Sequence, residues 1–263
     1  SGPGTGPAEP QRTSEGILIY EGLPHASKVL YGNVLWDGAL SLAKLLAWRD
    51  SEAQGSLRGK RVLELGAGTG VVGLTAARLG ATAVVTDNEP EVVELMRRNI
   101  CANGLEEAAA AHLLDWEQPS TFLSQPFDLL VAADVLYEGD GSAFASALEA
   151  HLAEGTVAYV ANHHHADRCA ATLGCLGRLL AAGLRIERLE DSSGRAAGSL
   201  QGQPSDASQL FQGCRFAPLE GPGALEAVRA AEFRCDPSAS PIHRIQIFRI
   251  SRPQRSPAGG SKL

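Results

Sequence analysis

Residues 61–70 of the chain read RVLELGAGTG. An apolar run ends at Leu65, three glycines follow at alternate positions, and a helical pattern begins after Gly70. Glycines let the backbone turn sharply and approach a ligand, and the N-terminus of a following helix offers unpaired N–H groups. This junction is typical of a parallel sheet that binds a nucleotide-like cofactor, although a purely steric turn is the alternative.

The spacing of the glycines argues against a dinucleotide. The NAD fingerprint has glycines at positions one, three and six, whereas position six counted from Gly66 is Val71. Two acids stand at strand ends: Glu64 precedes the loop, and Asp87 ends the next apolar run. Because a carboxylate there accepts hydrogen bonds from ribose hydroxyls, we expect a nucleoside without a pyrophosphate.

Strand-like and helix-like stretches alternate along the chain, which predicts an α/β fold with a doubly wound sheet. The expected strands are 61–65, 83–86, 110–113, 128–133, 156–161, 184–190 and 243–250. The expected helices are 70–79, 91–102, 142–153 and 166–182, with further helical patterns at 39–46 and 224–232. No helix-sized crossover directly precedes the last strand, so we expect it to return antiparallel as an edge pair with the strand at 184.

The two ends of the chain differ from its middle. Residues 1–14 are rich in Gly, Pro, Ser and Thr, which predicts a disordered arm, and 251–263 reads as a flexible tail. The tail ends in Ser261-Lys262-Leu263, a peroxisomal address if this terminus is native. Between them we expect a single domain, 15–250, with an insertion at 191–240.

Composition fits a single folded domain. A chain of 263 residues with 44% hydrophobic content can bury a full core, and no apolar run approaches the roughly 20 residues that cross a bilayer. The net charge of −7 argues against nucleic acid as a main partner, because phosphate binding needs a clustered basic surface. Nothing requires an assembly, so we expect a monomer.

The cysteines and histidines do not predict a metal site. The five cysteines are odd in number and form no C-x-x-C pair, so we expect reduced thiols in an intracellular protein, cytoplasmic or peroxisomal. His163, His164 and His165 are consecutive, and consecutive side chains point in different directions. A loop near a substrate is the simpler interpretation of this run.

Five segments together resemble a known family. They are 32–39 (GNVLWDGA), 64–70 (ELGAGTG), Asp87, 114–116 (LDW) and 133–137 (ADVLY). In this order they resemble the seven-β-strand protein lysine methyltransferases of the methyltransferase-like type, and the D-x-x-Y element is the most particular part. The resemblance implies a Rossmann-like, mostly parallel seven-stranded sheet with helices on both faces. It also implies S-adenosylmethionine as methyl donor, S-adenosylhomocysteine as product, and a lysine of a non-histone protein as acceptor.

The resemblance assigns donor-binding roles to the matched residues around the glycine loop. Asp87 accepts the ribose hydroxyls, and an N-cap for the helix beginning near Pro90 is its alternative role. The backbone of Gly66, Ala67 and Gly68 follows the methionyl and ribose part of the donor. Glu64 lies near the donor ammonium or holds the loop.

Two tryptophans and an alanine complete the expected donor site. Trp116 follows the third strand, where its indole offers a flat face for an adenine, with core packing as the alternative. Trp36 lies against the donor by resemblance, and a hydrophobic staple for the following helix is compatible with that role. Ala133 ends the fourth strand beside them.

The resemblance places the catalytic residues Asp134 and Tyr137 just beyond the fourth strand, at the sheet edge where open α/β sheets bind ligands. A lysine side chain, with an ordinary pKa of about 10.4, is mostly protonated at neutral pH and offers no lone pair. We expect Asp134 to orient the amine as a hydrogen-bond acceptor and Tyr137 to line the lysine channel. A capping role for Asp134 in the next segment is the alternative.

Two other functions remain open at this stage. A small-molecule methyltransferase would use the same loop, and only the D-x-x-Y element argues against it. The other is a binding module that keeps the fold but has lost activity. The glycine loop, both acids and both tryptophans are present, which argues against such a loss. Binding of S-adenosylhomocysteine excludes the inert module, and transfer of label into protein separates the remaining two.

Overall fold

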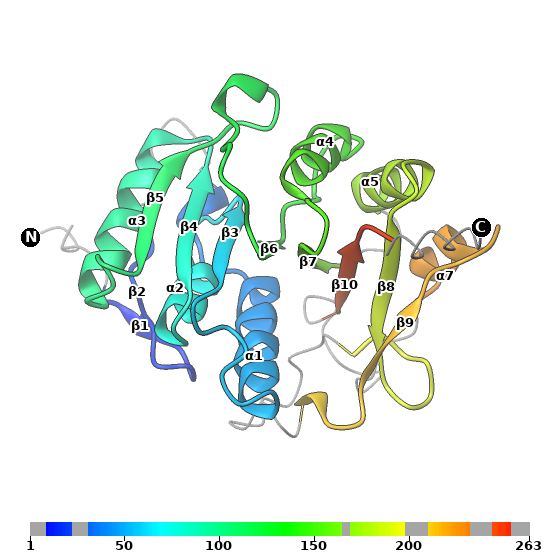
Figure 1. Cartoon of the computed structure of the whole chain (residues 1–263), viewed down its shortest axis with the longest axis horizontal. Coiled ribbons are helices and arrows are strands. Elements are labelled where there is room, and N and C mark those ends of the chain that lie inside the picture. The colour runs from blue at the N-terminus through cyan, green and yellow to red at the C-terminus, as the bar shows by residue number, and fades with distance from the viewer. Residues whose placement is uncertain (1–8, 23–30, 165–168, 198–209, 232–243, 254–263) are drawn as a thin grey trace, which may run out of the picture.

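The computed structural model contains an eight-stranded central sheet with helices on both faces, as expected for an α/β fold (Figure 1). The structure describes residues 9–22, 31–164, 169–197, 210–231 and 244–253. The strands of the sheet are β3 (Arg61–Leu65), β4 (Thr82–Asp87), β5 (Ala109–Leu113), β6 (Leu129–Ala133), β7 (Val157–His163), β8 (Arg185–Glu190), β9 (Arg215–Pro218) and β10 (Ile245–Ser251).

The strand order is β5-β4-β3-β6-β7-β10-β8-β9. Strands β3 to β7 pair in parallel, and the antiparallel β10 lies between β7 and β8. The expected antiparallel pairing with β8 is therefore confirmed, but the pair does not form the edge of the sheet, because β9 lies outside β8 and β10 lies inside it. Strand β10 is buried by neighbours on both sides, and even its polar Gln246 is 2% exposed. Alternating isoleucines predict a strand, but they do not say which strands flank it.

An eighth strand departs from the seven that were expected. Strand β9 lies in the predicted insertion and pairs antiparallel with the outer side of β8. It has four residues, ends in Pro218 and is at most half-buried, so it carries no alternating pattern that sequence reasoning can detect.

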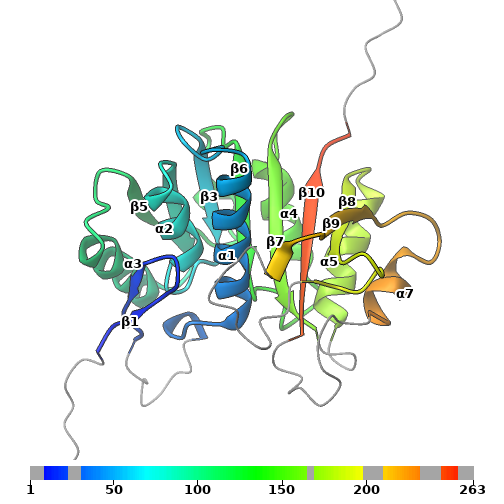
Figure 2. The same ribbon diagram turned by 90° about the horizontal axis from the view of Figure 1, so that it is seen from below.

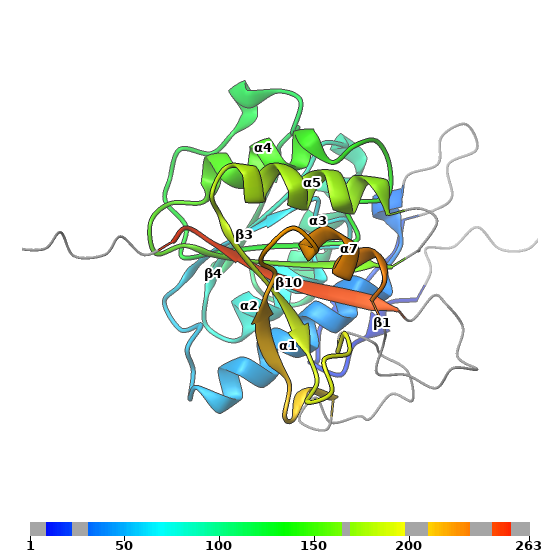
Figure 3. The ribbon, with the colours of Figure 1, turned by 90° about the vertical axis from the view of Figure 1, so that its right-hand side faces the viewer.

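The helices form two layers. Helices α1 (Asp37–Glu52), α2 (Val71–Arg78) and α3 (Pro90–Ala102) share one apolar cluster with the sheet, and α4 (Ser142–His151), α5 (Ala170–Ala181) and α7 (Ala224–Arg229) share the other. Figure 3 shows α4 and α5 on one side of the sheet and α1 and α2 on the opposite side. Two short 3-10 helices, η1 (Tyr31–Asn33) and η2 (Pro119–Thr121), lie in connections.

The alternation within β3 determines which way its acid points. Val62 packs in the cluster with α1 and α2, whereas Leu63 and Leu65 pack in the cluster with α4 and α5. Because side chains alternate along a strand, Glu64 shares the face of Val62 and points toward α2. The apolar pattern of this strand thus sends a carboxyl group under the helix that follows the glycine loop.

A short hairpin precedes the sheet. Strands β1 (Gln11–Arg12) and β2 (Leu18–Ile19) pair antiparallel and lie beside α3 (Figure 2). Asn99 and Asn103, one helical turn apart on α3, accept hydrogen bonds from the backbone N–H groups of Tyr20 and Leu18, both at 2.8 Å. The predicted arm 1–14 overlaps this hairpin, so the described structure begins before residue 15.

Several predictions fall on segments outside the described residues. These are positions 1–8 of the arm, 166–168 of the predicted helix, parts of the insertion, Cys235, His165, and the tail from 254 with its terminal tripeptide. Within the described part, no disulfide joins the other four cysteines. No helix among the described residues has the length and apolar character that a membrane span requires.

Candidate active site

A cavity of about 440 Å³ opens at the C-terminal ends of β3, β4 and β6. The residues that the sequence assigned to donor binding and catalysis all line it: Trp36, Glu64, Gly66, Ala67, Gly68, Asp87, Trp116, Ala133, Asp134 and Tyr137. The cavity also takes Tyr31 and Val34 from the segment before α1, and Glu89 and Glu138 from the loops after β4 and β6. Four connections of the sheet thus meet around one space.

The floor of the cavity is backbone in the left-handed region, which glycine adopts most readily. Gly66, Gly68 and Gly70 have φ angles of +65°, +53° and +82°, a region that costs other residues energy. A Cβ added to Gly66 would lie 2.8 Å from Trp116 Cζ2 and from Val135 Cγ1. Steric demand and ligand access therefore coincide at Gly66, and the two interpretations of the loop are not exclusive.

Asp87 lies at the rim of this floor. Its Oδ2 accepts the N–H of Gly68 at 3.1 Å, and its Oδ1 accepts the N–H of Glu89 at 3.2 Å. Burial raises the pKa of Asp87, and these backbone hydrogen bonds oppose the rise. The N-cap position of α3 belongs to Glu89, so the alternative role of Asp87 as that cap is wrong. The carboxyl instead links the glycine loop to the loop after β4.

Glu64 is 1% exposed, and its Oε2 accepts the N–H of Gly73 at 2.7 Å. Burial raises the pKa of Glu64 to about 8, against the lowering effect of the backbone hydrogen bonds from Gly73 and Val72. A Cβ on Gly73 would lie 2.8 Å from this oxygen. Of the two roles expected for Glu64, the geometry favours holding the first turn of α2 against the loop.

Trp116 and Trp36 both line the cavity. Trp116 packs edge-on against Phe144, with ring centroids 5.1 Å apart, and it also lines the cavity. Core packing and ligand contact are thus both compatible with its position. Trp36 is 42% exposed and occupies the N-cap position of α1, and its Nε1 donates to the carbonyl of Tyr31 at 2.9 Å. A hydrophobic staple requires the preceding position, so that role does not apply.

Asp134 is held by three donors. Its Oδ2 accepts the N–H of Gly38 at 2.8 Å, and its Oδ1 accepts the backbone N–H and the Nδ1 of His163 at 2.9 and 2.7 Å. The side chain is 8% exposed, and the backbone φ is +55°, which is rare for a residue with a side chain. Asp134 therefore does cap a helix, but it caps α1, which precedes it, and not the segment that follows.

Sequence reasoning missed the partners of Asp134. Gly38 lies inside the first turn of α1, where glycine is unfavourable by propensity alone, and that cost was the available signal. His163 was treated as part of a histidine run. In the structure it ends β7 and contacts Asp134, whereas the Nδ1 of His164 pairs with Gln246 at 2.9 Å. The two histidines thus diverge, as consecutive residues of a strand do.

Tyr137 stands at the mouth of the cavity. It is 56% exposed, and its ring centroid lies 5.2 Å from that of Tyr31. Partial burial raises the pKa of its hydroxyl, as do the nearby carboxylates of Glu138 and Asp87. Asn162 holds the residue before it, accepting from the N–H of Leu136 at 3.1 Å and donating to its carbonyl at 3.2 Å.

The charged residues that line the cavity are acidic. They are Asp87, Glu89, Asp115, Glu117, Asp134 and Glu138, and the buried Glu64, whose pKa is raised to about 8, is largely protonated at neutral pH. No Lys, Arg or His stands among the lining residues in the described part of the chain. A space lined in this way attracts cations and disfavours phosphates.

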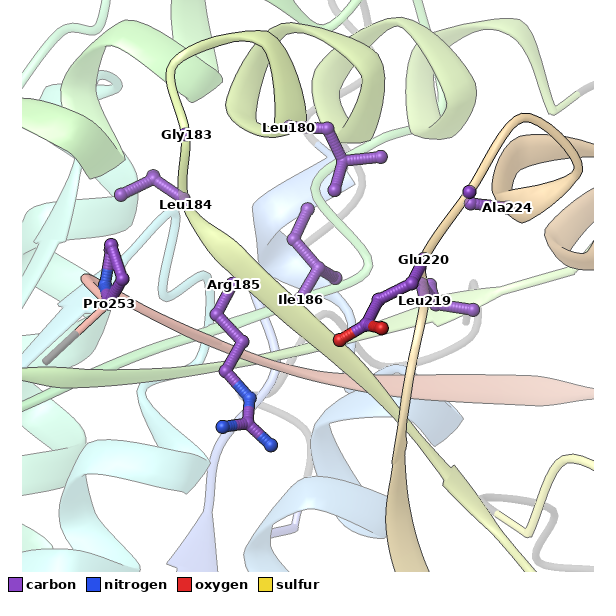
Figure 4. Close-up of a pocket in the computed structure, with 10 residues that line it drawn as sticks. Leu180, Gly183, Leu184, Arg185, Ile186, Leu219, Glu220, Ala224 and Pro253 are labelled. Atoms are coloured by element: carbon purple, nitrogen blue, oxygen red, sulfur yellow. The ribbon is translucent and has the colours of Figure 1, made fainter.

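A second cavity of about 470 Å³ lies at the other end of the sheet (Figure 4). Its walls are mainly aliphatic, and they include Leu180 of α5, Leu184 just before β8, Ile186 of β8 and Leu219 just after β9. It contains none of the residues predicted for the site, so we place the chemistry in the first cavity.

Comparison with known proteins identifies a family that the chain matches. The sequence model of a family described as lysine methyltransferase matches residues 25–168, more than half of the chain. This span contains every residue predicted for the site.

Individual relatives each match less than half of the chain. The protein N-lysine methyltransferase METTL21A of Danio rerio is 39% identical over 127 residues, which is 46% of this chain and 56% of that protein. The EEF1A lysine methyltransferase 3 of Mus musculus is 36% identical over 107 residues, or 39% of this chain and 43% of the relative. The chain thus spans about half the length of these curated relatives.

A solved structure extends the likeness of fold. The crystal structure of the cyclase SpnF covers 89% of each chain with a TM-score of 0.52 and 20% sequence identity. At this identity the match concerns the fold alone, because one fold hosts many functions.

Proposed function

Because the chain belongs to the lysine methyltransferase family, we propose that it transfers a methyl group from S-adenosylmethionine to the side-chain nitrogen of a lysine in a non-histone protein. The observation that carries the proposal is the meeting, in one cavity, of the glycine loop with Asp134 and Tyr137. The first element suits a nucleoside, and the other two suit an amine.

The residues around the loop fit the donor. The backbone of Gly66 lines the cavity in close contact with Trp116, where a Cβ would lie 2.8 Å from the indole, and Asp87 lines the cavity beside it. Asp87 has acceptor positions beyond the two backbone groups it already binds, which suits ribose hydroxyls. The half-buried indole of Trp116 offers an apolar face for the adenine. Glu64, Ala67, Ala133 and Trp36 complete the donor side.

When bound, the donor would supply a methyl carbon on a sulfonium, to which an amine lone pair would bond in line as the C–S bond breaks and the neutral thioether, S-adenosylhomocysteine, leaves. The chain must therefore present a deprotonated amine at a fixed angle and exclude water. Asp134 accepts one N–H of the amine and so turns the nitrogen lone pair toward the methyl side. Tyr137 lines the lysine channel, and its ring attracts the ammonium group of the lysine before that group loses its proton.

The electrostatics of the cavity support a lysine as acceptor. The acidic lining attracts an ammonium group, and partial burial then disfavours its charged form. The carboxylates draw the side chain in and stabilise its charged form, whereas burial lowers its pKa, so burial has to outweigh the carboxylates before the amine loses its proton. A phosphate-bearing acceptor such as nucleic acid would meet repulsion from the same carboxylates.

The proposal is tested by methyl transfer in a cell extract. The purified chain is incubated with an extract and isotope-labelled S-adenosylmethionine, and mass spectrometry then maps the label. We expect label on a lysine of a protein, and its loss with Asp134→Ala. Label confined to small metabolites indicates the small-molecule alternative, and no label above that of a heat-treated control contradicts the activity.

A further inference from the structure

We infer that His163 is a positioning residue for the proposed methyl transfer, because it fixes the direction in which Asp134 accepts the substrate amine. The inference rests on the proposed function. It concerns a residue that neither the D-x-x-Y element nor the glycine loop contains. His163 is the last residue of β7, and Asp134 directly follows β6. Because β6 and β7 are adjacent parallel strands, the sheet brings the two residues together.

The acceptor positions of Asp134 can be counted. An ionised carboxylate has about four lone-pair positions, two on each oxygen. In the structure Oδ1 accepts both the backbone N–H and the ring Nδ1 of His163, and Oδ2 accepts the N–H of Gly38. Oδ1 is therefore full, and Oδ2 keeps one position for a substrate N–H. A single remaining position determines the direction of the amine.

The ring of His163 contributes what its backbone does not. The backbone N–H of His163 binds Oδ1 of Asp134 in any variant. When the ring is removed, the second lone-pair position of Oδ1 becomes open. The amine then has two oxygens to choose from, and the lone pair is no longer aimed in one direction. Since misplacement by about 1 Å costs on the order of a hundredfold in rate, this loss of direction is sufficient to slow transfer.

The contact also defines the tautomer of the ring. An ionised carboxylate only accepts hydrogen bonds, so Nδ1 of His163 must carry a proton to bind Oδ1 at 2.7 Å. This consequence is observable without any methyl transfer. It separates the geometric part of the inference from the activity.

The first experiment reads the tautomer directly. Nitrogen-15 NMR of the histidine rings distinguishes Nδ1–H from Nε2–H, and His163→Asn identifies the signal by its loss. We expect a protonated Nδ1 at His163 in the wild type and loss of this preference in Asp134→Ala. A wild-type ring with the proton on Nε2 and none on Nδ1 overturns the inference.

The second experiment compares His163→Ala with His163→Asn. The amide nitrogen of Asn stands at the same distance along the side chain as Nδ1, so it restores the donor. With a fixed extract and labelled S-adenosylmethionine, we expect Ala to lower the maximal rate at least tenfold while the donor KM stays within twofold, and Asn to recover most of the rate. The exposed His112 on β5 gives the control variant His112→Ala, which retains the wild-type rate.

The outcomes separate the two proposals. Equal rates for wild type and His163→Ala overturn the role of His163 and leave the proposed function standing. The same conclusion follows if His163→Ala and His163→Asn lose the same fraction of the maximal rate. A wild-type chain that transfers no label overturns the proposed function and this role together, while the ring tautomer still reports the contact. Binding of S-adenosylhomocysteine to each variant shows that it is folded.

Discussion

The backbone N–H of Gly38 donates to the carboxylate of Asp134 at 2.8 Å, across 96 positions of sequence. A Cβ on residue 38 would lie 2.4 Å from Oδ2 of Asp134, closer than any real contact of that kind. The start of α1 therefore accommodates the carboxylate only because residue 38 lacks a side chain. The relationship links the amphipathic helix before the glycine loop to the amine side of the cavity.

Replacing Gly38 by Ala tests this link. We expect Gly38→Ala to displace the Asp134 carboxylate and to lower the rate of methyl transfer at least tenfold, a barrier increase of about 1.4 kcal/mol. Crowding costs about 1–3 kcal/mol of stability, partly offset by the better helix propensity of Ala. Rates with labelled donor and urea unfolding measure both.

The matched control is Gly177→Ala in α5. An added Cβ there would meet only Leu225 Cδ1, at 3.4 Å. We expect wild-type rates and an unchanged or slightly increased stability from this variant. Similar rate losses in both glycine variants would show that the contact with Asp134 has no special role.

The glycine loop gives a second prediction, for donor binding. Gly66 and Gly59 both have positive φ angles, but a Cβ meets Trp116 and Val135 at 2.8 Å only at Gly66. Backbone strain of about 1–2 kcal/mol is therefore common to Gly66→Ala and Gly59→Ala. We expect calorimetry to detect S-adenosylhomocysteine binding in Gly59→Ala and none in Gly66→Ala. Comparable affinities would contradict a floor made of glycine backbone.

Glu64 predicts how stability depends on pH. Burial raises its pKa from an ordinary 4.5 to about 8, so between these values the folded state holds a proton that the unfolded state releases. Stability is therefore greatest below about pH 4.5 as far as Glu64 is concerned, and it falls as the pH rises toward 8. Glu64→Gln keeps an acceptor for Gly73 and removes this titration.

Urea unfolding at pH 5 and pH 8 measures the effect. We expect the free energy of unfolding of the wild type to fall by a few kcal/mol more than that of Glu64→Gln over this range. An equal change in the free energy of unfolding between pH 5 and pH 8 for the two proteins would show that the buried carboxyl does not titrate in this range.

The N-terminal hairpin is coupled to the glycine loop through Asn99. This fully buried amide accepts the N–H of Tyr20, and it donates to the carbonyls of Tyr20 and Thr69, at 2.8, 3.1 and 2.9 Å. We expect Asn99→Ala to cost about 2–4 kcal/mol of stability, because it leaves buried backbone groups unpaired. We also expect several-fold weaker binding of S-adenosylhomocysteine in a calorimetric titration.

Asn103→Ala is the control for this coupling. Asn103 binds the backbone of Leu18 in the same hairpin but makes no contact with Thr69. It should therefore lose stability and retain donor affinity. If both variants bind the donor equally well, the hairpin serves stability alone.

The donor side of the cavity was predictable because its residues share a local rule. Glu64 and Asp87 end neighbouring parallel strands, and the carboxyl ends of such strands meet at one edge. The period of two in β3 also determines that Glu64 points toward α2. Local pattern thus sufficed to bring these groups together.

The amine side required information that no local pattern carries. Asp134 is held by residues 96 and 29 positions away, one in a helix and one at the end of a strand. The glycine at 38 is unfavourable inside a helix and the histidine at 163 belongs to a histidine run, but neither feature says that the residue contacts Asp134. The position of β10 between β7 and β8 was missed for the same reason, since alternation predicts a strand but not its neighbours.

The central claim is that a sulfonium nucleoside binds with its sugar on Asp87 and its methyl group directed toward Asp134. Calorimetric titration with S-adenosylhomocysteine, of the wild type and of Asp87→Ala, tests it most directly. We predict one site per chain in the wild type and at least tenfold weaker binding in Asp87→Ala, because the ribose hydroxyls lose their hydrogen bonds to the buried carboxylate. No heat of binding in the wild type, or equal affinity in both proteins, would contradict the claim.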